Sequence, residues 1–227
     1  MTEIFDEWPE KYDRWFETPI GRLIKKYESQ LVLEMLRPGQ GERILDAGCG
    51  TGVLTRDVLT AGAQVVGLEL SLPMLLRAET KLLGYLFHMV RGDMRWLPFA
   101  DNAFDKTFSV TAIEFIVEAT AAIAELFRVT KPGGSIVVAT LNSLSPWAGR
   151  RKAKAKEDDS VFEHALFRSP EELLNLSPVE GVVKTAIHFQ KHDNPEEAKR
   201  IEKNGQLKGL VTGAFVVARW EKPAEIR

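Results

Sequence analysis

The stretch "LDAGCGTG", Leu45 to Gly52, decides the fold of this chain, because three alternate glycines join a strand-like run to a helix-like run. Glycines at these positions let the backbone turn tightly and approach a ligand that side chains would keep away. The amino end of the following helix offers unpaired amide groups to the same ligand. The stretch therefore predicts a strand, a ligand-binding loop and a helix, with a nucleotide-like molecule held at the loop.

The spacing of the glycines narrows the type of ligand. A dinucleotide fingerprint that uses Gly48 and Gly50 needs its third glycine where this chain has Val53. The loop also lacks the lysine of a phosphate-binding P-loop. These differences argue against a nicotinamide-dependent oxidoreductase and against nucleoside triphosphate hydrolysis.

Strand-like and helix-like segments alternate on both sides of this loop, which predicts a mostly parallel sheet with helices on both faces. The nearly continuous apolar runs at 64–70 and 134–142 are typical of strands buried on both sides. The other strand-like segments before residue 143 are 43–48, 86–93 and 104–110.

The two ends of the chain add further elements. Residues 18–36 predict a helix with Thr18 as its cap. Residues 143–181 break the alternation, and Ser169 and Glu172 predict a capping box within them. The last two strand-like runs predict an antiparallel hairpin with a long polar connection. These runs are 182–189 and 213–222.

Composition limits the classes of partner. The 227 residues carry 30 basic and 32 acidic side chains, so no overall field attracts nucleic acid or an anionic membrane. Cys49 is the single cysteine, and no Cys/His cluster has zinc spacing. The amino terminus lacks the apolar run of a signal peptide, and no segment reaches the roughly 18 apolar residues of a membrane span. We expect a cytoplasmic protein with no metal, no membrane and no nucleic acid as partner.

Four motifs in order carry a family resemblance: "DAGCGTG" at 46–52, Glu69 at the end of the next strand, "GDMRWLPF" at 92–99 and "KPGG" at 131–134. Together they resemble the class I S-adenosylmethionine-dependent methyltransferases, within them the type 11 group related to quinone-biosynthesis C-methyltransferases. The resemblance implies an α/β, doubly wound, mostly parallel seven-stranded Rossmann-like sheet with an antiparallel C-terminal hairpin. It also implies one methyltransferase domain over 1–227, divided into N-terminal lid helices (1–37), a cofactor-binding core (42–142), an acceptor-side insertion (143–181) and a C-terminal strand pair (182–222).

The resemblance also implies a cofactor site for S-adenosylmethionine, with S-adenosylhomocysteine as product. Asp46 would order the loop and hold the cofactor's amino group, Glu69 would accept from both ribose hydroxyls, and Asp93 would accept from the adenine amine. The alternatives are that Glu69 is an exposed strand end and Asp93 a turn former. The expected cofactor-binding residues are Tyr12, Asp46, Gly48, Cys49, Gly50, Gly52, Glu69, Leu70, Met74, Asp93, Met94 and Thr111.

The leader "YDRWFETPIG", residues 12–21, matches the position of a lid over the cofactor in the family. A movable apolar flap would exclude water and still admit the cofactor. We expect Tyr12 to touch the methionine end of the cofactor, and Trp15 and Phe16 to pack on the lid or the acceptor pocket. The alternative is that Trp8, Trp15 and Phe16 only fasten the leader to the core.

The implied activity is methyl transfer to a small-molecule acceptor by in-line displacement, which alignment and exclusion of water can accelerate. A general base is needed only if the acceptor must lose a proton early. No catalytic residue is assigned, and the candidates are Glu114, His164 and Tyr12; His188 is expected to be structural. Oxygen, nitrogen, carbon and sulfur acceptors stay open, as does the oligomeric state.

Two other functions are alternatives to this activity. The first is an S-adenosylmethionine-binding sensor or scaffold without catalysis, against which stands the insertion on the acceptor side. The second is a nucleic-acid methyltransferase, which would carry an Asn/Asp-Pro-Pro-aromatic motif or a Pro-Cys nucleophile, and this chain has neither. Its one basic run, "RRKAKAK" at 150–156, is short and predicts a solvated helix or loop.

Overall fold

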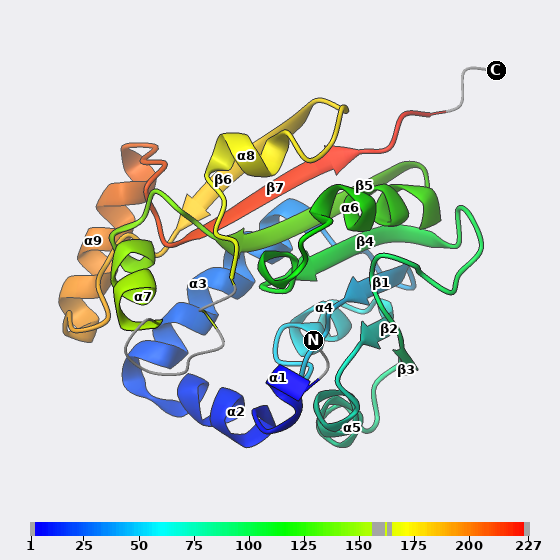
Figure 1. Ribbon diagram of the computed structural model, residues 1–227, viewed down its shortest axis with the longest axis horizontal. Coiled ribbons are helices and arrows are strands. Elements are labelled where there is room, and N and C mark those ends of the chain that lie inside the picture. Colours follow the sequence, from blue (N-terminus) through cyan, green and yellow to red (C-terminus); the bar gives the residue numbers. More distant parts are fainter. Residues whose placement is uncertain (1–2, 156–161, 163–164, 225–227) are drawn as a thin grey trace.

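A seven-stranded mixed sheet runs through the computed structural model, which describes residues 3–155, 162 and 165–224 (Figure 1). The first five strands are parallel, and β7 is antiparallel to both β5 and β6. This confirms the predicted α/β fold with its antiparallel terminal pair. The strands, in the spatial order β3-β2-β1-β4-β5-β7-β6, are β1 (Arg43–Ala47), β2 (Gln64–Glu69), β3 (Phe87–Arg91), β4 (Phe104–Val110), β5 (Thr130–Leu141), β6 (Gly181–Ala186) and β7 (Phe215–Glu221).

The order of the strands reverses at β1, whose neighbours are β2 on one side and β4 on the other. The connections after β1 and β4 therefore leave on opposite sides of the sheet. A crevice opens between them at the carboxyl ends of the strands, where ligands bind in doubly wound folds.

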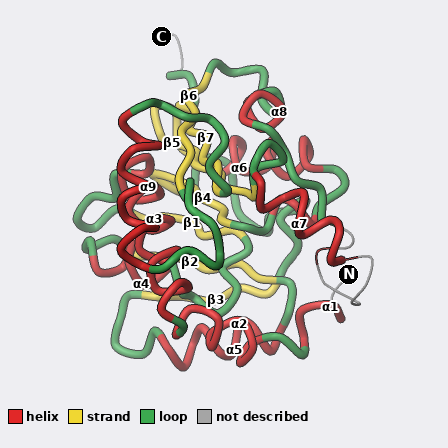
Figure 2. The backbone as a smooth tube through the Cα atoms, turned by 90° about the vertical axis from the view of Figure 1, so that its left-hand side faces the viewer, coloured by secondary structure: helices red, strands yellow, loops and turns green. Residues whose placement is uncertain are grey.

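Helices cover both faces of the sheet (Figure 2). One face packs against α3 (Pro19–Leu36), α4 (Thr55–Thr60) and α9 (Pro195–Leu207), and the other against α6 (Ala119–Val129) and α8 (Pro170–Leu174). Adjacent strand residues alternate between the two cores, so that Ile44 belongs to the first and Leu45 to the second. Strands of this kind bury both sides, which explains their continuous apolar sequences.

Two predicted starts of helices are confirmed. The Thr18 hydroxyl accepts from the Gly21 amide at 3.0 Å and caps α3. Ser169 and Glu172 form the capping box of α8, with the Ser169 amide donating to Glu172 Oε2 at 2.6 Å.

The start of one strand and the presence of one helix differ from the sequence prediction. The fifth strand begins at Thr130 rather than at Gly134, because "KPGG" continues the strand past a register shift opposite Phe104–Lys106. The polar connection between β6 and β7 contains α9, which Asn194 caps. Its inward face carries Ala198, Glu202 and Gly205, and the small and charged residues there conceal the helical periodicity of an apolar face.

The leader forms two short helices, α1 (Glu3–Asp6) and α2 (Pro9–Glu17), and both contact α5 (Leu72–Lys81). Figure 1 shows α1, α2 and α5 together below the carboxyl ends of the strands. The leader is therefore an ordered part of the wall around the crevice.

The insertion begins with α7 (Pro146–Ala155), which contains most of the basic run. The interpretation of this run as solvated is wrong for Arg151, because its guanidinium lies over the rings of Trp147 and Phe162, at 5.3 and 5.0 Å from their centroids. Arg150 is exposed, as expected. Within the described ranges, none of the helices combines the length and the apolar character that a membrane crossing requires.

Candidate functional site

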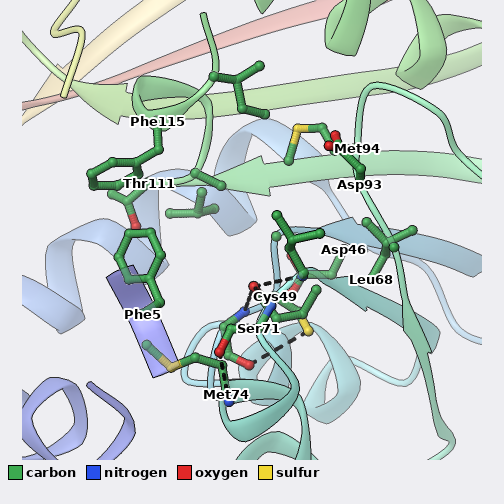
Figure 3. Close-up of a pocket in the computed structure, with 18 of the residues that line it drawn as sticks. Phe5, Asp46, Cys49, Leu68, Ser71, Met74, Asp93, Met94, Thr111 and Phe115 are labelled. Carbon is green, nitrogen blue, oxygen red and sulfur yellow. Dashed lines mark hydrogen bonds between the residues drawn. The ribbon is translucent and has the colours of Figure 1, made fainter. Parts of the chain in front are cut away.

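A cavity of about 690 Å³ opens at the carboxyl ends of β1, β2 and β4. Its walls come from the loops after β1, β2, β3 and β4, from α1 and α2, and from the insertion (Figure 3). It brings together all the predicted cofactor residues except Gly52. The lining residues are Phe5, Tyr12, Asp46, Gly48, Cys49, Gly50, Val53, Leu54, Leu68, Glu69, Leu70, Ser71, Met74, Gly92, Asp93, Met94, Arg95, Phe108, Val110, Thr111, Ala112, Phe115, Ile116, Val117, Ala165 and Leu166.

The glycines of the first loop have distinct roles. Gly48 and Gly50 have left-handed backbones, with φ of 80° and 53°. A Cβ on Gly48 would lie 2.5 Å from the Cβ of Ala112, whereas a Cβ on Gly50 would meet no protein atom within 4 Å. Gly52 lies outside the cavity, and a Cβ there would meet Leu82 at 2.8 Å. Gly50 therefore leaves open space at the cavity, and Gly52 permits close packing against the end of α5.

Asp46 lies near the end of β1, just before this loop. Its carboxylate is 3% exposed and accepts from the Thr55 hydroxyl at 2.6 Å. Burial raises the pKa of Asp46 to about 7, and the Thr55 hydrogen bond opposes that rise. The residue thus fastens the loop to α4 and faces the cavity with a carboxyl group that can keep its proton near neutral pH.

Glu69 connects the first loop to the second. Its Oε1 accepts from the Leu70 and Ser71 amides at 2.8 and 2.9 Å, and its Oε2 accepts from the Gly50 amide at 2.9 Å. A carboxylate has about four acceptor positions, so Oε2 retains one for a ligand hydroxyl. Burial raises the pKa of Glu69, and the three amides oppose that rise.

Asp93 lies after β3, and its carboxylate is held by Arg95. The Arg95 guanidinium donates to Asp93 Oδ2 at 2.7 Å, and the Arg95 amide donates to Oδ1 at 2.9 Å in a local turn. The interaction with Arg95 holds the pKa of Asp93 below its usual range. Asp93 is therefore both a turn former and a cavity residue. Sequence reasoning missed Arg95, although the spacing Asp-x-Arg inside "GDMR" was a signal for the pair.

The opposite side of the cavity is lined by aromatic rings. Figure 3 shows Phe5 and Phe115 together, across the cavity from Asp93 and Met94. The two rings meet edge to face, with centroids 4.9 Å apart. We call the part of the cavity lined by Phe5, Tyr12, Thr111 and Phe115 the aromatic recess.

Two residues of the aromatic recess depart from ordinary values, Thr111 in its backbone conformation and Tyr12 in its pKa. Thr111 has a left-handed backbone, with φ of 49°, which is uncommon for a β-branched residue and is typical of functional sites. Burial raises the pKa of Tyr12, and an interaction with Thr111 opposes that rise. Phe5 and Phe115 were not predicted, since nothing in the sequence shows that two rings so far apart in the chain meet.

The leader is fastened over the cavity by two acidic residues. Asp13 accepts from the Thr51 hydroxyl and from Lys81 Nζ, each at 2.7 Å, and from Arg77 Nε at 3.0 Å. The Ser71 hydroxyl donates to Asp6 at 2.6 Å. The loop after β1 is therefore bonded directly to α2, and the loop after β2 directly to α1.

The aromatic residues of the leader divide between two roles. Trp15 packs against the first core and lies outside the cavity lining, with Lys191 Nζ 4.7 Å from its ring. Phe16 meets the ring of Tyr12 edge to face at 5.2 Å. Trp15 thus fastens the leader to the core, as the alternative proposed, while Phe16 supports a residue of the cavity.

The candidate catalytic residues lie in different surroundings. Glu114 is fully buried and does not line the cavity, although its neighbour Phe115 does. Its Oε2 accepts from the Thr140 hydroxyl at 3.0 Å, and its Oε1 has no hydrogen-bond partner among the described residues. His164 lies outside the described residues. Burial raises the pKa of Cys49 well above its ordinary value, so this thiol is protonated at neutral pH.

His188 lies away from the cavity. It forms a buried pair with Glu202, with Nδ1 and Oε2 3.1 Å apart, which agrees with the structural role expected for it. In the part of the chain that the structure describes, no three His, Cys, Asp or Glu side chains gather as a metal site.

Comparisons with known proteins agree with this geometry. Residues 45–138 match a family model described as a methyltransferase domain. The chain is 38% identical over 132 residues to a malonyl-acyl-carrier-protein O-methyltransferase of Pseudescherichia vulneris, covering 54% of this chain and 52% of that protein. It is 35% identical over 139 residues to a demethylmenaquinone methyltransferase of Renibacterium salmoninarum, covering 61% and 57%. The chain thus spans about half the length of these relatives.

A solved structure matches over the whole chain. It is a methyltransferase of Thermotoga maritima, named an S-adenosylmethionine-dependent enzyme and a "possible histamine N-methyltransferase". The two chains are 27% identical, the match covers 98% of this chain and 100% of that one, and the TM-score is 0.73. The similarity therefore includes the leader and the insertion as well as the central sheet.

Proposed function

Since residues 45–138 belong to the methyltransferase domain family, in its class I S-adenosylmethionine-dependent form, we propose that this chain methylates a small molecule held in the aromatic recess. One observation carries the proposal. A single cavity joins the loops after β1, β2 and β3, which suit a nucleoside cofactor, to an aromatic and apolar side that is free to hold a second molecule.

The residues present fit the cofactor. Gly50 leaves space at the loop, Glu69 retains an acceptor position for a ribose hydroxyl, and Asp93 with Met94 would border the adenine. Asp46 would face the amino group, and Tyr12 would close the methionine end. When bound, S-adenosylmethionine supplies an electrophilic methyl carbon, to which the acceptor's lone pair bonds while the carbon–sulfur electrons remain on sulfur.

The chain itself contributes alignment and exclusion of water. Helices α1 and α2 border the cavity and are bonded to the loops after β2 and β1 through Asp6 and Asp13, respectively. The apolar lining from Val110 and Ile116 keeps water from the reacting atoms. An arrangement of this kind accelerates in-line transfer without a residue that bonds to substrate.

The acceptor has to be inferred from this chain's own side chains. The relatives' names indicate a carrier-bound malonyl group and a quinone precursor, and the Thermotoga protein's name suggests an amine. The shared family region, residues 45–138, supplies the loops after β1, β2 and β3 and also Thr111 and Phe115 of the recess. The leader adds Phe5 and Tyr12.

A pair of glycine variants tests cofactor binding. Gly50→Ala places a methyl group on a left-handed residue that lines the cavity, whereas Gly41→Ala makes the same change at a left-handed residue outside it. Each costs about 1 kcal/mol in backbone strain. We expect calorimetric titration to show loss of S-adenosylhomocysteine binding in Gly50→Ala alone. Equal affinities in the two variants would contradict the placement of the cofactor.

Turnover separates an enzyme from a sensor. We expect transfer of a labelled methyl group from S-adenosylmethionine to small acceptors. Tight cofactor binding with no transfer across a broad panel of acceptors would favour the non-catalytic sensor instead.

A further inference from the structure

We propose that the aromatic recess recognises an acceptor whose reacting end is an amine carried on an apolar body. This inference rests on the proposed methyl transfer and names the substrate class. It depends on two features from different parts of the chain: a group of aromatic rings that line the recess, and two buried carboxylates that act electrostatically on Tyr12.

The rings suit a positively charged group. Phe5, Tyr12 and Phe115 all line the recess, and Phe5 meets Phe115 edge to face. The faces of such rings carry negative charge density and attract ammonium groups, most strongly where water is excluded. Side chains of Val110, Ile116 and Leu166 line the neighbouring wall and suit the apolar remainder of the acceptor.

The carboxylates of Glu28 and Glu114 lie outside the cavity lining and act electrostatically on Tyr12. They come from α3 and from the turn η1 (Ile113–Phe115), and their side chains are 8% and 0% exposed. Glu114 Oε1 has no hydrogen-bond partner among the described residues. A buried carboxylate oxygen without a partner is costly, so it favours any donor or positive charge that enters nearby.

Two described guanidinium groups act on these two carboxylates. Arg151 interacts electrostatically with both Glu28 and Glu114. Arg168 also faces Glu114, but its Nη1 donates to the carbonyl oxygens of Ile113 and Leu166, each at 3.1 Å. Neither of these guanidinium groups donates to Glu114 Oε1, so a buried carboxylate oxygen near the recess keeps an unmet need for a donor.

The negative charge reaches the recess through Tyr12. The Tyr12 ring lines the cavity, and its hydroxyl lies in the field of Glu28, Glu114 and Asp13. Asp13 is paired with Lys81 and Arg77, so the two glutamates dominate that field. An ammonium group in the recess gains from both the rings and the field, whereas a carboxylate is repelled by both and an uncharged hydroxyl gains little from either. For methyl transfer the ammonium first releases one proton to solvent. The freed lone pair then bonds to the methyl carbon, and the nitrogen regains its positive charge while the carbon–sulfur electrons stay on sulfur.

The test uses three probes that differ only at one end: phenethylamine, phenethyl alcohol and hydrocinnamate. Each is titrated by calorimetry at about pH 8 into the full chain saturated with S-adenosylhomocysteine, because burial raises the pKa values of Glu28 and Glu114 to about 7 and both groups have to be ionised. We expect the amine to bind at least about tenfold more tightly than the alcohol and the carboxylate to bind weakest. Tighter binding of the alcohol or the carboxylate would overturn the inference.

Two isosteric variants test whether the buried glutamates cause the preference for the amine. Glu114→Gln and Glu28→Gln should each weaken amine binding about tenfold and leave the alcohol unchanged. Glu34→Gln is the matched control, because Glu34 is an exposed residue of the same helix as Glu28. This variant should bind the amine and the alcohol as tightly as the unmodified chain does. If neither Glu114→Gln nor Glu28→Gln changes the affinity for the amine, the role of the carboxylates is refuted.

The titration with S-adenosylhomocysteine distinguishes failure of the proposed function from failure of this inference. If the unmodified chain does not bind S-adenosylhomocysteine, the proposed function is wrong. If it binds the cofactor product but not the amine, only this inference is wrong. Each variant is first shown to retain S-adenosylhomocysteine binding, and if Glu114→Gln does not fold, Glu28→Gln still decides the question.

Discussion

Asp13→Asn removes the charge that fastens the leader to the first cofactor loop. The Asp13 side chain is 12% exposed, and its partners Arg77 and Lys81 are 41% and 28% exposed. Hydrogen bonds to buried charged groups contribute about 1.5–3 kcal/mol each, and solvent reduces that contribution for exposed partners. We therefore assign about 2 kcal/mol to the charge, since the amide keeps some of the hydrogen bonds.

If the fastened leader retains the cofactor, that loss weakens S-adenosylhomocysteine binding by up to about thirtyfold. Calorimetry measures this affinity, and urea unfolding measures stability in the same preparations. Asp57→Asn is the matched control, because Asp57 accepts from Ser29 at 2.7 Å and joins α3 to α4 outside the cavity lining. The control should lose stability and keep its affinity. An Asp13→Asn protein that loses stability but binds as tightly as the unmodified chain would refute the reasoning.

Deletion of residues 1–17 should weaken cofactor binding more than it lowers the melting temperature, and the reverse result would mean that the leader only fastens to the core. Gly205→Ala should destabilise the chain despite the usual gain of about 1 kcal/mol for alanine in a helix, because its Cβ would lie 2.3 Å from His188. Gly149→Ala, in α7 with no atom within 4 Å, should show that gain in urea unfolding. Burial raises the pKa of Glu28 from 4.5 to about 7, so its burial costs nothing below 4.5 and lowers the free energy of unfolding as pH rises toward 7. Glu28→Gln should flatten that decline, and an unchanged slope between about pH 5 and about pH 8 would contradict the burial argument.

The sequence predicted the sheet and the loops that line one side of the cavity, because both depend on local patterns. The alternation of apolar runs reveals strands buried on two faces, and the spacing around Gly48 and Gly50 specifies the loop that the structure contains. Ser169 and Glu172 likewise identify a start of a helix from neighbouring residues alone.

What the sequence could not predict depends on long-range contacts. Helix α9 buries Glu202 against His188, and a charged residue on an inward face hides the helical period. The meeting of Phe5 with Phe115, and of Glu28 with Arg151, is set by how distant helices pack. For this reason the loops that line the cavity could be predicted from the sequence, while the aromatic recess became visible only in three dimensions.

Ligand-dependent melting is the most direct test of the assigned cofactor. The purified chain is heated alone, with S-adenosylhomocysteine and with NADH, at matched concentrations. We predict that S-adenosylhomocysteine raises the melting temperature of the unmodified chain and has no effect on Gly50→Ala. Stabilisation by NADH without stabilisation by S-adenosylhomocysteine would contradict the assignment of this cavity to S-adenosylmethionine.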